Sequence, residues 1–140
     1  MTRALILGAT GGIGRALSAR LEAQGAQVTG LSRSADGMDL TRPDTVADHA
    51  ARLAGQSFDL IVNTTGALVI DGHQPEKSLD AVDADAMARQ FALNATGVAL
   101  AIQAFGPLLA RDRRAVFASL SARVGSIGDN DLGGWIGYRA

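Results

Sequence analysis

Four glycines stand within seven residues near the start of the chain, in the stretch LILGATGGIGRAL (5–17). An apolar run precedes them and a helical pattern follows, which places them in a strand-to-helix turn. In such a turn, glycines let the backbone bend sharply and let an anionic group approach the free N–H groups that open the helix. The predicted ligand is the pyrophosphate of a dinucleotide, held by Gly8, Thr10, Gly11, Gly12, Ile13 and Gly14.

The spacing of these glycines leaves two classes of nucleotide-binding oxidoreductase open. Positions 8, 12 and 14 give GxxxGxG, whereas positions 8, 11 and 14 give GxxGxxG. Neither is the GxGxxG spacing of many dinucleotide-binding turns. The alternative interpretation is a glycine-rich turn that only packs a helix against a strand. The apolar run before it and the helical pattern after it favour the nucleotide site.

Ser32 and Arg33 follow the second apolar run and point to a phosphorylated coenzyme. A dinucleotide-binding domain usually has Asp or Glu about 20 residues after the glycines, where it holds the ribose hydroxyls. Here no carboxylate repels a 2′-phosphate, and the planar guanidinium of Arg33 suits one. Arg15, one residue past the last glycine, is placed to reach the same phosphate. We therefore expect NADP rather than NAD, with two solvated arginines as the alternative.

Three further segments line up with one family. Asn63-Thr64-Thr65-Gly66 follows an apolar run, Asn94 lies within a long helical pattern, and the segment Ser119–Tyr138 follows the last apolar run. Together with GxxxGxG, these segments resemble the classical short-chain dehydrogenases/reductases, whose NNAG and YxxxK motifs NTTG and Tyr138 match. The stretches PEKSL (75–79) and SARVGSIGDNDLGGWIGYRA (121–140) are similar to the C-factor-like carbonyl reductase subgroup. The resemblance covers the whole chain.

The resemblance implies reduction of a ketone or aldehyde to an alcohol by hydride transfer from NADPH. Tyr138 would give the alkoxide its proton, and Asn94 would hold a water that relays protons. A serine would orient the carbonyl group, but alanine stands at the usual position, so Ser121 or Ser126 must replace it, with Ser121 preferred. The implied coenzyme contacts are Asp39 and Leu40 at the adenine, and Asn63, Thr64 and Gly66 near the ribose.

The chain departs from the family pattern at its end. The lysine that follows the family's tyrosine by four residues would be residue 142, beyond Ala140. We therefore expect residues 1–140 to be one NAD(P)-binding domain that lacks the C-terminal strands, as the N-terminal part of a longer enzyme or a truncated product. Two other functions stay open: an inactive nucleotide-binding or signalling module, and an extended-family epimerase, whose GxxGxxG also fits.

These side chains need a sheet that brings the ends of its strands together. Short apolar runs alternate with longer periodic segments, which is typical of βα units on a parallel sheet. We expect a Rossmann-type, doubly wound α/β fold with strand order 3-2-1-4-5 and three α/β/α layers. The predicted strands are Ala4–Leu7, Gln27–Ser32, Phe58–Val62 and Ala115–Leu120, with a brief edge strand at Met38–Leu40.

Three helices connect these strands. The first runs from the glycine turn to Gly25. The second begins near Pro43, with Thr41 as its cap, and ends near Leu53. The third is long, from an Asp83 cap to Phe105, and the segment beside Asn94 suggests a backbone irregularity. We expect this helix to pair protomers in a homodimer or homotetramer, as the family does.

Composition limits the partners. The net charge of −1 and the lack of a basic run give no electrostatic case for nucleic acid or an anionic membrane. The chain has no cysteine, and His49 and His73 have no partners at metal spacing, so we expect no metal and two surface histidines. No signal peptide and no run of about 18 apolar residues is evident. A soluble cytoplasmic protein acting on a small carbonyl compound is the expectation.

Overall fold

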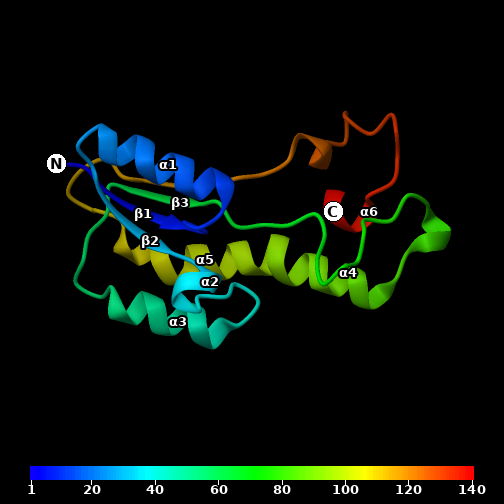
Figure 1. Ribbon diagram of the computed structural model, residues 1–140, viewed down its shortest axis with the longest axis horizontal. Coiled ribbons are helices and arrows are strands. Elements are labelled where there is room, and N and C mark those ends of the chain that lie inside the picture. The colour runs from blue at the N-terminus through cyan, green and yellow to red at the C-terminus, as the bar shows by residue number, and fades with distance from the viewer.

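The computed structural model describes all 140 residues and is built on four parallel strands (Figure 1). These strands pair in the order β2-β1-β3-β4, and their bounds are β1 (Arg3–Leu7), β2 (Gln27–Leu31), β3 (Leu60–Asn63) and β4 (Val116–Ser119). Leu7 lies opposite both Leu31 and Asn63, and Asn63 lies opposite Ser119. The carboxyl ends of all four strands therefore meet at one edge of the sheet, where ligands bind in open α/β folds.

The brief edge strand expected at Met38–Leu40 is not formed, so the sheet has four strands instead of five. The backbone N–H of Met38 donates to the carbonyl of Ser32, and that of Asp39 donates to the hydroxyl of Thr45. These local partners take the groups that a strand ladder would use. The segment still contributes to the core, because the side chains of Met38 and Leu40 are both 2% exposed.

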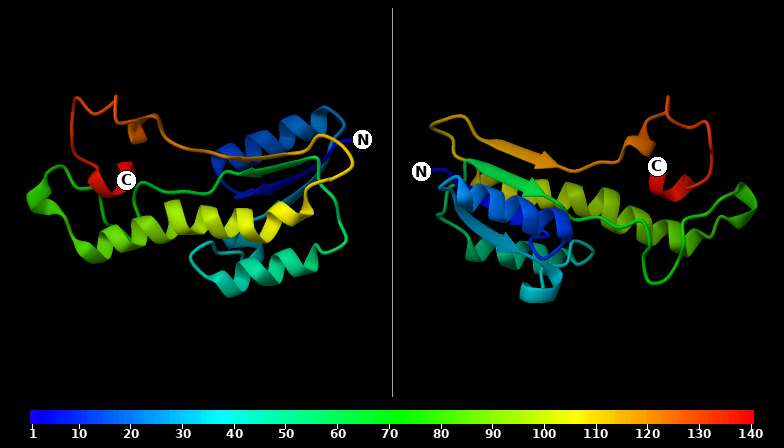
Figure 2. Two further views of the ribbon diagram at one scale, coloured as in Figure 1. Left: turned by 180° about the vertical axis from the view of Figure 1, so that it is seen from behind. Right: turned by 45° about the horizontal axis from the view of Figure 1, so that its top comes forward.

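Helices cover both faces of the sheet, so the predicted three layers are confirmed (Figures 1 and 2). One face carries α1 (Gly12–Ala23), and the other carries α3 (Pro43–Arg52) and the long helical segment that includes α5 (Gly97–Phe105). A short helix, α2 (Arg33–Asp36), follows β2 directly. The expected cap of α3 is wrong: Thr41 bonds to Asp39 through its own N–H and hydroxyl, and Arg42 takes the cap position.

The long helix is continuous but not regular. It comprises α4 (Ala84–Phe91), a π-helical turn η2 (Ala92–Thr96), α5 and a 3₁₀ turn η3 (Gly106–Leu108). Asp83 caps it as predicted, accepting the Ala86 N–H at 2.7 Å. The predicted irregularity is confirmed as the π turn, which contains Asn94. At Gly97, a Cβ atom would lie 2.9 Å from the Cβ of Leu40, so glycine lets the helix approach the loop after β2.

One expectation about hydropathy is corrected. The helical segment Ala84–Leu108 is 25 residues long and contains an 18-residue window with a mean hydropathy of 1.4, so by length and composition it could span a membrane. Only 17% of that window is buried. Counting consecutive apolar residues missed it because Asn94 and Gln103 interrupt the run without making the average polar. A single such helix is weak evidence for a membrane, and here it packs on β3 and α3.

The residues after β4 form a loop with little regular structure that ends in a short helix. A 3₁₀ turn, η4 (Arg123–Gly125), lies early in this loop, and α6 (Ile136–Arg139) lies near the end of the chain. In both views of Figure 2, α6 lies away from the sheet and close to the loop that precedes α4. That preceding loop contains another 3₁₀ turn, η1 (Leu79–Ala81).

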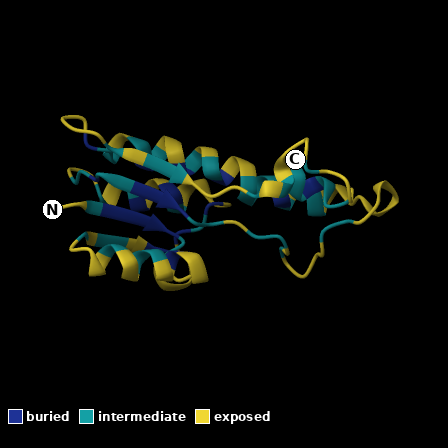
Figure 3. Ribbon diagram, turned by 90° about the horizontal axis from the view of Figure 1, so that it is seen from above, coloured by how far each residue is buried: buried dark blue, intermediate teal, exposed yellow.

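The core lies between the sheet and the helices of the α3 and α5 face (Figure 3). In β1, residues Ala4 to Leu7 are 0% exposed, as expected for the central strand of a parallel sheet.

His49, expected at the surface, is instead buried in α3, with its ring nitrogens 2.8 Å and 3.1 Å from the carbonyl oxygens of Thr45 and Asp36. The edge strand β4 keeps Val116 41% exposed.

Replacing Phe105 by alanine should lower the free energy of unfolding by about 3–5 kcal/mol, because its fully buried ring would leave a cavity between α5 and the sheet. Urea unfolding followed by far-UV circular dichroism measures this loss. Ile127→Ala is the control, since that side chain is 99% exposed and should change stability by less than about 0.5 kcal/mol. Equal losses in the two variants would contradict the assignment of the core.

Candidate functional site

The glycine turn joins β1 to α1 in a geometry that only glycine permits at two positions. Gly8 has φ +87°, and its N–H donates to the carbonyl of Leu31 at 2.7 Å. At Gly14, a Cβ atom would lie 2.2 Å from the carbonyl oxygen of Gly8. Gly30 in β2 belongs to the same packing, since a Cβ there would lie 2.7 Å from that of Ala9. The turn is thus pressed against both β1 and β2.

The first turn of α1 keeps its N–H groups available. Gly11 occupies the cap position and has no side chain to accept them. A Cβ atom built on Gly12 would meet nothing within 4 Å, and Ile13 is 61% exposed, so the space in front of this helix end is open. An N-terminus with free donors and open space suits an anionic group such as a pyrophosphate.

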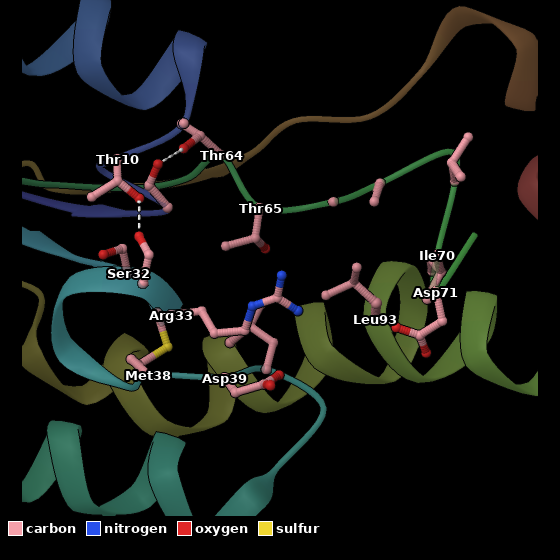
Figure 4. A pocket seen from close by; sticks show the side chains of 17 residues that line it. Thr10, Ser32, Arg33, Met38, Asp39, Thr64, Thr65, Ile70, Asp71 and Leu93 are labelled. Carbon is pink, nitrogen blue, oxygen red and sulfur yellow. Dashed lines mark hydrogen bonds between the residues drawn. The ribbon is translucent and has the colours of Figure 1, made fainter. Parts of the chain in front are cut away.

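A cleft of about 330 Å³ opens at the carboxyl ends of the strands (Figure 4). It gathers residues from the glycine turn, the segment after β2, the segment after β3 and the long helix. Of the predicted coenzyme residues, its lining contains Gly8, Thr10, Gly11, Ser32, Arg33, Asp39, Leu40, Thr64 and Gly66. The structure therefore brings together four chain segments that are distant in the sequence.

The segment after β2 presents hydroxyls and one guanidinium to this cleft. Ser32 caps α2 by accepting the Ala35 N–H at 3.1 Å. The hydroxyls of Thr10 and Ser34 lie 2.9 Å apart and join the glycine turn to α2. The side chain of Arg33 extends into the cleft between Thr65 and Leu93 (Figure 4). The end of β2 therefore offers a cation and hydroxyls to the cleft. The Asp36 carboxylate lies outside the cleft lining and accepts the N–H and the hydroxyl of Ser32 at 2.8 Å and 3.2 Å.

Asp39 is the acidic residue of the cleft nearest to this corner. Burial raises the pKa of its carboxyl, but hydrogen bonds from the side chain and backbone of Thr41, with the charges of Arg33 and Arg42, outweigh that effect. The pKa of Asp39 therefore lies below its usual value, and the group is ionised at neutral pH. Its Oδ1 atom is occupied by Thr41. The adjacent Leu40 side chain is buried in the core.

The NTTG segment (63–66) joins the ends of the strands next to the cleft. Asn63 is fully buried and does not line the cleft; its amide donates to the Ser119 hydroxyl at 3.1 Å and accepts from the N–H and hydroxyl of Thr65. The Thr64 hydroxyl donates to the carbonyl of Leu7 at 2.8 Å. These bonds hold the ends of β1, β3 and β4 together. Thr64 and Gly66 reach the cleft itself.

Asn94 ties the π turn to the same segment. Its Oδ1 accepts the Ala67 N–H at 3.0 Å, and its Nδ2 donates to the Ala67 carbonyl at 2.9 Å and to Gln90 Oε1 at 2.6 Å. Gln90 in turn donates to the carbonyl of Leu68 at 2.7 Å. Two amide side chains, one turn apart on the long helix, therefore fix the path of the chain after β3.

The remaining predicted residues lie outside the lining of this cleft. Tyr138 is half-buried on α6, with its ring edge-on to that of Trp135 at 6.2 Å between centroids. Ser121 and Ser126 are exposed in the loop after β4, and neither hydroxyl bonds to another protein group. Arg15 donates to the carbonyl of Thr10 at 3.1 Å and is exposed. Asn94 also lies outside the lining, as do Gly12, Ile13, Gly14 and Asn63.

The sequence predicts that the loop Ala67–Gln74 lines the substrate pocket, and four of its residues do line this cleft: Ala67, Val69, Ile70 and Asp71. The other lining residues, Ser34, Met38, Thr65 and Leu93, were missed. Thr65 stands inside the NTTG segment and Ser34 beside Arg33, so both had a signal in the sequence. Ile70 and Asp71 lie in a tight turn whose shape depends on the positive φ of Asp71 and Gly72.

Comparison with known proteins gives one family match and one curated relative. The model of the NAD dependent epimerase/dehydratase family matches residues 4–122. The 1-hydroxy-2-glutathionyl-2-methyl-3-butene dehydrogenase of Rhodococcus sp. (strain AD45) is 31% identical over 153 residues. The match covers 99% of this chain and 64% of that relative, so the chain spans just under two thirds of the relative's length.

Two solved structures from Burkholderia multivorans share the fold. A candidate short-chain alcohol dehydrogenase has a TM-score of 0.84 at 23% identity, and the match covers 99% of this chain and 70% of that one. A candidate short-chain dehydrogenase/reductase with bound NADP has a TM-score of 0.80 at 23% identity, with coverage of 99% and 66%. These likenesses confirm the predicted Rossmann-type α/β fold.

Gly14→Ala should destabilise the protein by more than about 2 kcal/mol, because the added methyl meets the backbone of Gly8, which cannot move without breaking its bond to Leu31. Gly12→Ala is the matched control in the same helical turn, with open space at its Cβ position. It should change stability by less than about 0.5 kcal/mol. Thermal unfolding of both variants tests this, and similar melting temperatures would refute the close approach.

Proposed function

The chain belongs to the NAD dependent epimerase/dehydratase family, and we propose that it forms the coenzyme-binding part of an NADPH-dependent oxidoreductase that reduces a ketone or aldehyde. The observation that carries this proposal is the pairing of two features in one cleft. These are the glycine turn, whose Gly8, Thr10 and Gly11 line the cleft up to the cap of α1, and the Arg33 guanidinium at the end of β2. A dinucleotide laid across the strand ends would meet both.

The residues present fit NADP. Free N–H groups at the start of α1 would hold the pyrophosphate. Arg33, with the hydroxyls of Thr10 and Ser34, would hold the 2′-phosphate, since a guanidinium gives charge-assisted hydrogen bonds to phosphate oxygens. Ser32 would border this phosphate, while its own hydroxyl donates to Asp36. The B. multivorans dehydrogenase/reductase with bound NADP supports this choice by its shared fold. Asp39 would lie near the adenine, and Asn63, through Thr65, would support the ribose side of the cleft.

The proposed chemistry is hydride transfer to a carbonyl carbon with proton transfer to its oxygen. NADPH supplies the hydride when bound. Tyr138 would donate its hydroxyl proton to the developing alkoxide, and Ser121 or Ser126 would hold the carbonyl oxygen by a hydrogen bond. Asn94 shapes the chain after β3 in this structure, and we propose that it also orders a proton-relaying water. The Rhodococcus relative, named as a dehydrogenase, supports the oxidoreductase class.

Two other functions have specific support. The family model includes epimerases and dehydratases by its description, and the GxxGxxG spacing agrees with that group. An epimerase that returns its hydride would consume no NADPH during turnover. An inactive nucleotide-binding module is favoured by Ala122, which stands where the resembled family has its serine. It would bind NADPH and turn over no substrate.

The cellular setting is also part of the proposal. We propose a cytoplasmic enzyme acting on a small carbonyl compound, with the C-factor-like carbonyl reductases as its nearest subgroup. The long helix through α4 and α5 would pair protomers in a homodimer or homotetramer. Its exposed residues support this, since only 17% of the residues in its apolar window are buried within one chain and Ile102 is 48% exposed. Dimer pairing would give that surface a partner.

Arg33→Ala should raise the Kd for NADPH by about 10- to 100-fold, because the variant loses a bidentate charge-assisted contact to the 2′-phosphate. The Kd for NADH should change by less than about threefold. Titration with each coenzyme, followed by its fluorescence, measures both values. Arg20→Ala on α1 is the matched control. An unchanged NADPH affinity in Arg33→Ala would overturn the coenzyme assignment.

Tyr138→Phe should lower kcat for carbonyl reduction by at least about 100-fold, because the ring remains but its proton donor is lost. The Kd for NADPH should stay the same, since Tyr138 does not line the coenzyme cleft. NADPH oxidation with a panel of ketones and aldehydes is the measurement. Retained turnover in this variant would exclude Tyr138 as the acid.

A further inference from the structure

The segment Pro75–Leu79 and the start of α6 are far apart in the sequence but are joined by two hydrogen bonds. The carbonyl oxygen of Glu76 accepts the Trp135 N–H at 2.5 Å. An oxygen of the Glu76 carboxylate accepts the Gly137 N–H. Glu76 therefore bonds to the residues on both sides of Ile136, and the second of these, Gly137, directly precedes Tyr138 in the sequence.

Two glycines make this contact sterically possible. A Cβ atom on Gly134 would lie 3.2 Å from both the Cα and the carbonyl oxygen of Lys77. A Cβ atom on Gly137 would lie 3.3 Å from the Glu76 carboxylate. Gly133 differs, because a Cβ there would meet nothing within 4 Å. The backbone at Gly134 thus lies directly against the backbone at Glu76 and Lys77.

The backbone before α6 is held in an uncommon conformation. Gly133, Gly134 and Trp135 have φ values of +60°, +67° and +52° in succession. The left-handed region is unfavourable for a residue with a side chain, by about 1–2 kcal/mol. Trp135 therefore needs outside support to keep this conformation. Its hydrogen bond to Glu76 supplies that support.

Arg139, at the C-terminal end of α6, holds this short helix to the loop after β4. Its guanidinium donates to the carbonyl oxygens of Gly134 and Val124, each at 2.8 Å, and of Asp129 at 2.7 Å. These bonds fold the loop after β4 around the short helix. The contact with Glu76 ties this folded unit to the segment before α4. The helix α6 also packs on α4 itself, where a Cβ atom on Gly137 would lie 3.5 Å from Cγ of Met87.

We propose that Glu76 is a positioning residue that sets the place of Tyr138 by anchoring the start of α6. The proposal rests on the proposed role of Tyr138 as the acid. Glu76 does not line the coenzyme cleft, so it acts on turnover and leaves coenzyme affinity alone. It also gives a role to the PEKSL stretch, which the coenzyme site does not use.

Two matched pairs of variants test this anchor. Glu76→Ala removes the carboxylate acceptor, and Glu22→Ala is its control, since Glu22 is exposed on α1 and makes no side-chain hydrogen bond. Gly134→Ala adds a methyl against Lys77, and Gly133→Ala is its control with a similar positive φ and open space. Glu76→Gln keeps an oxygen that can accept the Gly137 N–H, so it serves as the rescue variant.

The expected result is a separation between turnover and binding. Glu76→Ala and Gly134→Ala should lower kcat by about tenfold or more, because a displaced acid no longer meets the substrate oxygen. The Kd for NADPH should change by less than about twofold in both. Glu76→Gln should recover most of the lost kcat. Turnover in Glu76→Ala equal to that in Glu22→Ala would overturn the proposal.

A second readout does not depend on activity. Trp135 is the only tryptophan among the 140 residues, so acrylamide quenching of its fluorescence reports the anchor directly. Quenching should increase in Glu76→Ala and Gly134→Ala and stay unchanged in both controls. If the parent protein reduces no carbonyl compound, the proposed function fails, and quenching alone decides whether Glu76 anchors α6. Increased quenching with undiminished turnover would also reject the positioning role.

Discussion

The close approach of α1 to the turn after β1 is the constraint on which the coenzyme end of this fold depends. The helix can begin where it does only because Gly14 has no side chain above the Gly8 carbonyl. Gly30 allows the same turn to lie against β2. With the helix in this place, its free N–H groups face the strand ends, and the segment after β2 brings Arg33 to the same cleft.

The other side of the cleft is held in place by amide side chains that lie behind its lining. Buried Asn63 joins β3 to β4 and to Thr65, while Asn94 and Gln90 hold the next residues against the long helix. The π turn is part of this design, because it departs from α-helical geometry where Asn94 reaches across to Ala67. Such turns often occur at functional sites. The cleft therefore has one wall set by close backbone packing and another set by hydrogen bonds.

Much of this arrangement could be predicted because it follows from local signals. Alternating apolar runs gave the parallel sheet, and glycines at a strand-to-helix junction gave the anion-binding turn. The edge strand at Met38–Leu40 was wrong because its polar backbone groups found partners in Ser32 and Thr45, which no propensity reveals. His49 was misplaced at the surface for a similar reason, since its burial depends on a carbonyl from another helix.

The candidate site was predictable only in part. The coenzyme residues that touch the cleft lie in short motifs, so each could be read from its neighbours. The role of Asn63 could not, because its partners Ser119 and Thr65 meet it only when β3 and β4 pair. The contact between Glu76 and Trp135 was equally hidden, since the two residues are joined only by the folding of two irregular loops.

The loop from Ala67 to Glu76 has fixed attachments at both ends, and this bears on how the protein can diversify. Asn94 holds its first residue, and the hydrogen bonds of Glu76 hold its last. Substitutions or insertions between these two attachment points change one wall of the cleft and leave the hydrogen bonds that hold α6 in place. Evolution or a protein engineer can thus vary which molecules enter without rebuilding the machinery that would act on them.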